Sequence, residues 1–206
     1  MRPSRSGDAG QAFPIYITVV AGLLFLAFAY LAVGQAAANR NGAQTAADAA
    51  ALAAALDTRD QLAGKWVEDV LDPAKWQAIF DGDVEGLDLS CWRADELAAQ
   101  NDAHVLGCDP GVLSYEVEVE TDKSVGDSIV PGTEDEKSQA SATAVIEPRC
   151  TFDLPGEGTG DGEGDDVLPL PQLQCEDDRD WDPDPDDPAT LPGPEDLFDV
   201  HLADSE

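Results

Sequence analysis

The 206-residue sequence carries 43 acidic and 11 basic side chains, which gives a formal net charge of −32. Because nucleic-acid binding rests on lysine and arginine neutralising phosphates, this composition excludes DNA and RNA and favours basic partners or weakly bound divalent cations. The length allows one apolar segment plus one soluble domain of roughly 80 to 100 residues, and no second full domain.

An apolar segment lies near the start of the chain. Residues 9–39 contain no charged side chain, and Phe13–Val33 is almost wholly apolar. About 20 helical residues span the roughly 30 Å hydrocarbon core of a bilayer. The pattern therefore predicts a transmembrane helix over residues 13–34, with Tyr16 and Tyr30 near its two ends as interfacial aromatics.

The charges on either side of this segment predict its orientation. Arg2 and Arg5 precede it, whereas all the acidic residues except Asp8 follow it, so the positive-inside rule places residues 1–12 in the cytoplasm and exports the rest. The alternative is a cleaved secretory signal, since residues 36–38 are all alanine. The apolar run is longer than the usual signal core of about 7 to 15 residues, so we expect a permanent single-pass anchor in the cell membrane.

An alanine-rich extension, residues 35–62, continues the predicted helix, because alanine is the best helix former. Small side chains recur every four residues along one side of it: Gly34, Ala38, Gly42, Ala46, Ala50 and Ala54. Such a row lets a second helix approach closely. A polar stripe with the same spacing contains Arg40, Gln44 and Asp48, of which Gln44 and Asp48 can hydrogen-bond. The predicted helix-packing residues are Gly34, Ala38, Gly42, Gln44, Ala46, Asp48 and Ala50. The alternative is that alanine richness generates the row by chance and the stripe faces water.

The order Asn-Arg-x-x-Ala-Gln-x-Ala-Ala-Asp-Ala-Ala-Ala-Leu, residues 39–52, carries a resemblance to a known family. It is similar to the segment after the membrane helix in TadE/TadG-like proteins of the tight-adherence (Flp) pilus system, most of all the actinobacterial members. The resemblance covers roughly residues 7–62. It implies a pilin-like or pilus-assembly membrane protein that packs against other membrane helices, alongside a secretion ATPase, a platform protein and a major pilin.

One departure from the family pattern concerns processing. Processed pilin-like members carry a glycine before the cleavage point and a glutamate five residues later. Here Gly10 is followed at that offset by Ile15, and Gly7 by Ala12. We therefore expect a permanently inserted assembly factor rather than a polymerising subunit.

Residues 63–152 are expected to form a small exported α+β domain. Asp72 followed by proline predicts a short helix to about Phe80, and Ser90 is the expected cap of a second helix to about Asn101. Residues 113–121 alternate valine and tyrosine with glutamate, which is the pattern of a half-buried strand. Residues 140–147 are a second expected strand after a long hairpin loop, residues 122–139.

The four cysteines indicate two disulfides in an oxidising compartment, since they are even in number and lack Cys-x-x-Cys spacing. They are Cys91, Cys108, Cys150 and Cys175. Our preferred pairing joins Cys91 with Cys108 and Cys150 with Cys175. A close competitor joins Cys108 with Cys150, because a hairpin of the two expected strands would bring these flanking positions together, and leaves Cys91 with Cys175.

Residues 153–206 are rich in Asp, Glu, Pro and Gly and are expected to form an acidic, mostly disordered tail. Within it, Leu197, Phe198 and Val200 could form one transient helical turn. A run of aspartates suggests calcium, but it lacks the glycine and final glutamate of an EF-hand loop, so we interpret it as solvated. The run comprises Asp177, Asp178, Asp180, Asp182, Asp184, Asp186 and Asp187.

No catalytic, cofactor or metal site is expected. His104 lies between Cys91 and Cys108 in the sequence, but zinc sites usually need four ligands in close pairs. The glycine-rich run near residue 160 lacks the Lys-Ser/Thr ending of a phosphate loop. We therefore expect a non-enzymatic membrane component of a Flp-type pilus assembly or secretion apparatus. The alternative is an acidic, membrane-tethered surface protein that binds cations weakly or acts as a spacer.

Overall fold

The computed structural model describes residues 12–124, 135–154, 170–176, 179–187 and 190–204. Its helices are α1 (Ala12–Glu68), the 3-10 helix η1 (Pro73–Lys75), α2 (Trp76–Phe80), α3 (Cys91–Gln100) and α4 (Pro194–Leu197). Its strands are β1 (Ala103–Pro110), β2 (Ser114–Thr121), β3 (Gln139–Pro148), β4 (Cys150–Phe152), β5 (Leu173–Cys175), β6 (Arg179–Trp181) and β7 (Phe198–Leu202). The predicted α+β class, with a long apolar helix and a disulfide-linked domain, is confirmed.

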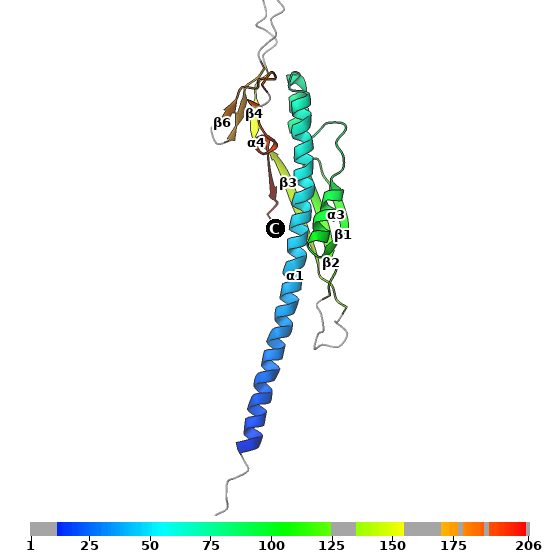
Figure 1. Ribbon diagram of the computed structural model, residues 1–206, viewed down its shortest axis with the longest axis vertical. Coiled ribbons are helices and arrows are strands. Elements are labelled where there is room, and N and C mark those ends of the chain that lie inside the picture. Colours follow the sequence, from blue (N-terminus) through cyan, green and yellow to red (C-terminus); the bar gives the residue numbers. More distant parts are fainter. Residues whose placement is uncertain (1–11, 125–134, 155–169, 177–178, 188–189, 205–206) are drawn as a thin grey trace, which may run out of the picture.

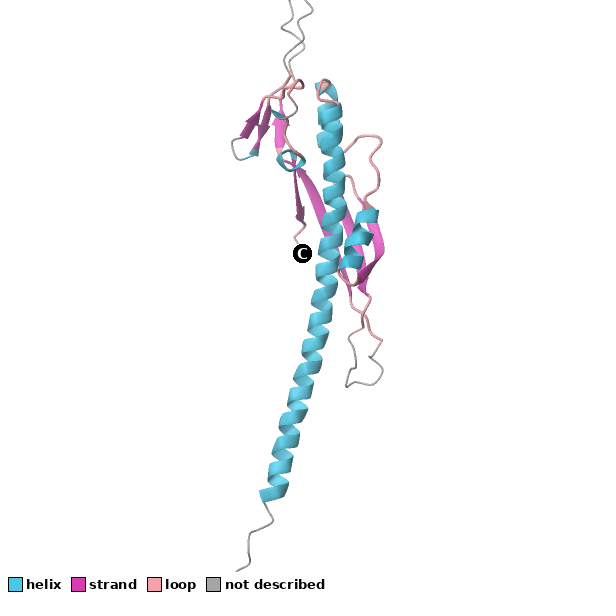
Figure 2. Ribbon diagram, in the orientation of Figure 1, coloured by secondary structure: helices cyan, strands magenta, loops and turns pink. Residues whose placement is uncertain are grey.

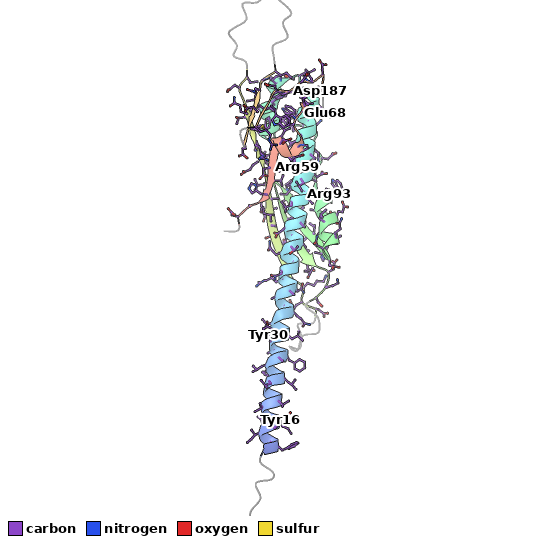
Figure 3. The ribbon with its side chains drawn as sticks, turned by 60° about the vertical axis from the view of Figure 1, so that its left-hand side comes forward. Tyr16, Tyr30, Arg59, Glu68, Arg93 and Asp187 are labelled. Atoms are coloured by element: carbon purple, nitrogen blue, oxygen red, sulfur yellow. A yellow bond between two sulfur atoms is a disulfide. The ribbon has the colours of Figure 1, made fainter. Side chains whose placement is uncertain are left out.

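Helix α1 is a single element of 57 residues, about 85 Å long at 1.5 Å per residue. All the strands gather around its C-terminal half, and its N-terminal half extends away from them (Figure 1, Figure 2). The side chains of that N-terminal half project freely, among them Tyr16 and Tyr30 (Figure 3). The helix continues past the expected end at residue 62, because Leu62 and Trp66 are buried in the domain.

The main sheet has the strand order β1-β2-β3-β7, and all its pairs are antiparallel. One face of this sheet packs on α1. Along β2 the side chains alternate as the sequence predicts: Tyr115, Val117 and Val119 are buried, whereas Glu116 and Glu118 are exposed. The second sheet has the order β4-β5-β6 and lies beyond the end of the main sheet (Figure 1).

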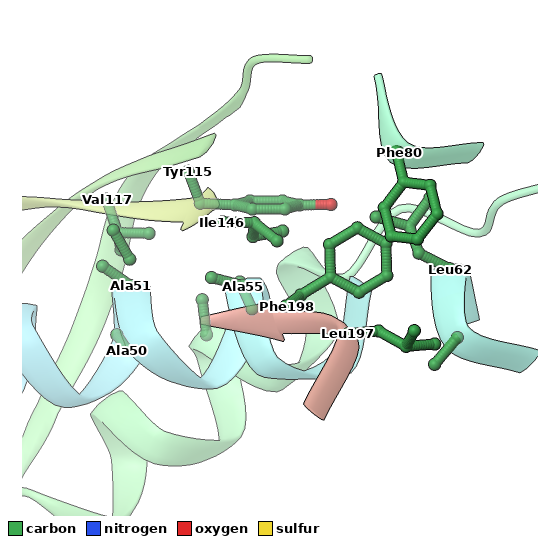
Figure 4. Close-up of a cluster of buried hydrophobic side chains, with 14 of the residues drawn as sticks. Ala50, Ala51, Ala55, Leu62, Phe80, Tyr115, Val117, Ile146, Leu197 and Phe198 are labelled. Carbon is green, nitrogen blue, oxygen red and sulfur yellow. The ribbon is translucent and has the colours of Figure 1, made fainter. Parts of the chain in front are cut away.

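The contact between α1 and the main sheet is built from alanine. Ala47, Ala51 and Ala55 of α1 are fully buried, and Figure 4 shows Ala51 facing Val117 of β2. Because an alanine projects only one methyl group, the helix backbone lies close to the sheet. Larger side chains close the core further along α1, where Leu62 lies near Phe80 and Phe198 (Figure 4).

The expected short helices are present with altered ends. Residues 73–80 form η1 followed by α2, and Asp72 makes no side-chain capping bond. Helix α3 follows Ser90 as expected, but the Ser90 hydroxyl does not cap it. That hydroxyl is fully buried and donates to the Asp57 carboxylate at 2.8 Å instead.

The two expected strands are confirmed as β2 and β3, paired antiparallel with Val117 opposite Ala142. The strand β1 was not predicted. It pairs with β2 across an irregularity between Val105 and Gly107, and this glycine-containing stretch has no regular alternation to detect. Residues 125–134 of the expected hairpin loop lie outside the described residues.

The preferred disulfide pairing is confirmed. Cys91 at the start of α3 is bonded to Cys108 of β1, and Cys150 of β4 is bonded to Cys175 of β5. The competing pairing fails because the chain leaves β3 for a second sheet. There Cys150 and Cys175 are directly opposite each other on neighbouring strands.

For the residues that the structure describes, the prediction of a mostly disordered tail is wrong. Residues 170–176 and 179–187 carry β5 and β6, and β7 completes the main sheet by pairing with β3. Leu197 and Phe198, expected to form only a transient turn, end α4 and begin β7 and are fully buried. Buried apolar side chains such as Leu197 and Phe198, together with the Cys150–Cys175 disulfide, pack this otherwise acidic segment against the rest of the domain.

Replacing Phe198 by alanine should therefore destabilise the whole domain. Truncating a fully buried phenylalanine typically lowers the free energy of unfolding by about 3–5 kcal/mol. Urea unfolding of the full chain in detergent, followed by the fluorescence of buried Trp66 and Trp76, measures this loss. The exposed neighbour Asp199→Ala is the control, with an expected change within about 0.5 kcal/mol. Equal, small effects of both substitutions would contradict the packed position of β7.

Candidate helix-packing surface

The predicted row of small residues on α1 divides into two halves with different surroundings. Ala46, Ala50 and Ala54 have no exposed surface and belong to the domain's own core. They pack inside the molecule, so they are not available to another protein. This part of the predicted packing surface is therefore intramolecular.

The other half of the row is exposed and lies outside the core of the domain. Gly34, Ala38 and Gly42 are exposed, and a Cβ atom added at Gly34 or Gly42 would have no neighbour within 4 Å. These three residues lie between the long apolar part of α1 and the first residues buried by the domain. They form the exposed small-residue surface of the chain.

The polar stripe contains a hydrogen-bonded pair. The Gln44 amide donates to the Asp48 carboxylate at 2.8 Å and to the carbonyl of Ser141 in β3 at 3.4 Å. Both side chains line a groove of about 520 Å³ between α1 and the edge formed by β3 and the end of β7. The Gln44 amide therefore links α1 to its own sheet, and Asp48 accepts from Gln44 within the helix. Arg40 is exposed.

Comparison with known proteins found a match to one family model. The model of the Flp pilus-assembly TadE/G-like family, Tad, matches residues 10–57. These 48 residues, less than a quarter of the chain, are similar to that family. No curated protein and no solved structure matches the chain. The match confirms the resemblance seen in the sequence.

The TadE/G-like segment contains every predicted helix-packing residue, from Gly34 to Ala50. It also contains the apolar N-terminal half of α1, which in the described structure is the one helix long and apolar enough to cross a membrane. Its most apolar window has no residue buried within the chain, unlike the core helix of a soluble protein. The family match ends at residue 57, within the part of α1 that the domain surrounds.

Sequence reasoning missed a buried polar network just past the TadE/G-like segment. The Thr58 hydroxyl donates to the Tyr115 hydroxyl at 2.9 Å and lies 2.8 Å from the hydroxyl of Ser90. The backbone N–H of Ser90 also donates to the Tyr115 hydroxyl. The network ties α1, the start of α3 and β2 together. Its only signal in the sequence is a hydroxyl residue inside an alanine-rich helix.

Two of the described charged groups have shifted pKa values. The amide of Gln139 and then the ammonium of Lys137, both donating to Glu120, hold the pKa of that carboxyl below its usual value. The Asp69 carboxylate, which accepts a hydrogen bond from Lys75, raises the pKa of that lysine. Both groups lie at the surface. Each shift therefore reflects hydrogen bonds and charges of neighbouring side chains.

No metal site is built from the described residues, since they contain no group of three suitable His, Cys, Asp or Glu side chains. The four cysteines are consumed by disulfides. His104 is exposed between the carboxylates of Asp122 and Glu120. Asp177 and Asp178 of the aspartate run lie outside the described residues, and the other members are exposed.

Leucine at position 46 should lower the stability of the domain, whereas leucine at position 42 should not. Ala46→Leu forces three extra carbon atoms into a packed contact, which should lower the free energy of unfolding by about 1–3 kcal/mol. Gly42→Leu meets open space and should not destabilise the domain. Urea unfolding of both full-length variants in detergent measures the difference. Loss of stability in Gly42→Leu alone would contradict the division of the row.

Proposed function

We propose that this chain is a single-pass membrane component of a tight-adherence (Flp-type) pilus assembly or secretion apparatus, and that it acts by helix–helix packing rather than catalysis. The observation that carries the proposal is the continuity of α1. One helix contains both the bare apolar segment and the helix at the centre of the domain, and the TadE/G-like match covers the junction between them.

The exposure of the N-terminal half of α1 supports membrane insertion. Phe25 is 72% exposed, Phe28 57% and Leu31 56%, on a segment with no charged residue. Such a surface would be unfavourable in water by about 25 cal/mol for each Å² of apolar area, and the hydrocarbon core of a bilayer removes that penalty. We infer that residues 13–34 span the membrane once.

The charges and disulfides support one orientation. Arg2 and Arg5 lie before the span, so the positive-inside rule retains residues 1–12 in the cytoplasm. The domain carries the acidic residues and two disulfides, which persist in oxidising compartments. We infer that the domain, from residue 35 onward, lies outside the cell membrane.

The exposed half of the small-residue row supports packing against a partner helix. Gly34 ends the inferred span, and Ala38 and Gly42 lie within about 12 Å of it, at 1.5 Å per residue. Small residues at such positions let two helix backbones approach closely. Other membrane helices of the pilus apparatus are the proposed partners, and the domain is held to them by a helix without a flexible linker.

Bulk on the exposed row should weaken the association with pilus components. The experiment is affinity purification of full-length Gly42→Leu from detergent-solubilised native membranes, with recovery of platform and pilin proteins measured by mass spectrometry. We expect recovery to fall at least about fivefold, because the larger side chain separates the helices, while membrane insertion is unchanged.

The matched control is Ala36→Leu, an exposed position about 9 Å before Gly42 along α1 and on another side of the helix. It should recover the partners as the wild type does. If the wild-type protein itself recovers no pilus component, the proposal is wrong and the acidic tethered surface protein becomes the better interpretation.

A further inference from the structure

One edge of strand β3 is only partly covered in the main sheet. Strand β7 pairs with β3 from Ala144 to Pro148, and next to this ladder the Ala203 N–H donates to the Thr143 carbonyl at 2.8 Å. Strand β7 therefore lies beside only part of β3 (Figure 1). In the part of the chain that the structure describes, residues 139–142 have β2 on one side and no strand on the other.

The backbone groups of this open edge point away from β2. Successive residues of a strand direct their N–H and C=O groups to opposite edges, and the Ser138 carbonyl accepts from the Thr121 N–H on the β2 side. Gln139 and Ser141, one and three residues later, therefore direct theirs to the open edge. The Gln44 amide agrees with this direction, because it donates to the Ser141 carbonyl at 3.4 Å. No described residue accepts from the N–H of Gln139 or Ser141.

The open edge lacks the features that usually protect an exposed strand. Proteins protect such edges with lysine, proline or a bulge, because unpaired backbone groups invite another strand. The strand at the other edge of the sheet, β1, has an irregularity between Val105 and Gly107 and ends at Pro110. Residues 139–143 read Gln-Ala-Ser-Ala-Thr and pair with β2 in regular register. An added strand would thus meet a regular, uncharged edge.

This edge is one wall of the groove of about 520 Å³, and α1 is the other. Among the described residues that line the groove there are two carboxylates, Asp48 of α1 and Asp204 after β7, and no lysine or arginine. Ala142 and Leu202 add apolar surface to the lining. Because carboxylates lie beside unpaired backbone groups, the groove is complementary to an extended backbone that carries a positive charge.

We propose that this groove binds an extended segment of a partner protein that carries a lysine or arginine, and that the segment pairs with residues 139–143 of β3 as an added strand. In this mode of recognition, main-chain hydrogen bonds provide affinity and side-chain contacts provide specificity. Five residues of β3 span about 14 Å, which suits a strand of ordinary length. The basic side chain of the segment pairs with Asp48 or Asp204.

The groove is separate from the surface proposed to pack against membrane helices. At 100° per residue, Gln44 lies about 160° around α1 from Gly42. Asp48 lies about 21 Å beyond Gly34 along the helix, at 1.5 Å per residue. The bound segment therefore belongs to a part of the partner outside the hydrocarbon core of the membrane.

Binding of a basic peptide to the full-length protein tests the strand addition. The protein is held in nanodiscs of zwitterionic phosphatidylcholine, so that the lipid does not attract the peptide. The probe is a dye-labelled peptide of alternating threonine and lysine, about six residues long, and its fluorescence anisotropy is followed at about 0.15 M salt. We expect it to bind at least about tenfold tighter than the same sequence built from N-methyl amino acids, which has the same charge and no backbone N–H.

Two pairs of variants locate the site. Ser141→Pro removes the N–H on the open edge, a position where a strand tolerates proline, and should weaken binding at least about tenfold. Ser141→Ala keeps that N–H and should bind as the wild type does. Asp48→Asn should weaken binding at least about threefold, because it removes a charge from the groove. Glu116→Gln removes an exposed carboxylate from the other face of the sheet and should have no effect.

Equal binding of the normal and N-methylated peptides would mean attraction by net charge alone and would overturn the proposal. Absence of binding, or equal effects of Asp48→Asn and Glu116→Gln, would overturn it as well. The comparison of the two peptides uses the wild-type protein, so it decides the question even if Ser141→Pro does not fold. Recovery of pilus components through α1 does not involve this groove, so a negative result here leaves the proposed function intact.

Discussion

The structure depends on the contact between the alanine surface of α1 and the main sheet. Ala47, Ala51 and Ala55 present a smooth ridge to the buried side chains of β2 and β3, and no larger residue would allow the helix to lie so close. The same helix, without interruption, carries the apolar residues of its N-terminal half. The domain is therefore built around the end of the segment that we propose to span the membrane.

This arrangement explains why alanine dominates so long a stretch. The buried alanines between residues 43 and 55 are small because they make contacts within the chain, whereas Gly34, Ala38 and Gly42 are exposed. A single compositional pattern thus serves two purposes along one helix. A tilt or rotation of α1 in the bilayer would move the domain with it, because no loop separates them.

The sequence allowed prediction of the features that depend on local pattern. The apolar run and the alanine richness predicted α1, and the alternation around Val117 predicted β2. The surroundings of the small-residue row were not predictable, because fourfold spacing does not reveal that Ala46 and Ala50 are buried in the domain while Gly42 is exposed. That distinction depends on where the sheet packs, which is a tertiary property.

The structure of the C-terminal segment was mispredicted from its composition. Its average composition is that of a disordered tail, yet Phe198 and Leu197 are fully buried and β7 completes the sheet. Composition averages over residues, whereas packing depends on a few anchors in the right places. The pairing of β7 with β3 spans about fifty residues, and no local pattern encodes it.

Amide hydrogen exchange of the full chain in lipid nanodiscs tests the central claim, that α1 passes unbroken from the apolar segment into the domain. The account predicts continuous protection of the amides of residues 30–45, because each N–H is bonded within one helix. Rapid exchange confined to residues 34–42 would reveal a hinge between the two parts and would contradict the account.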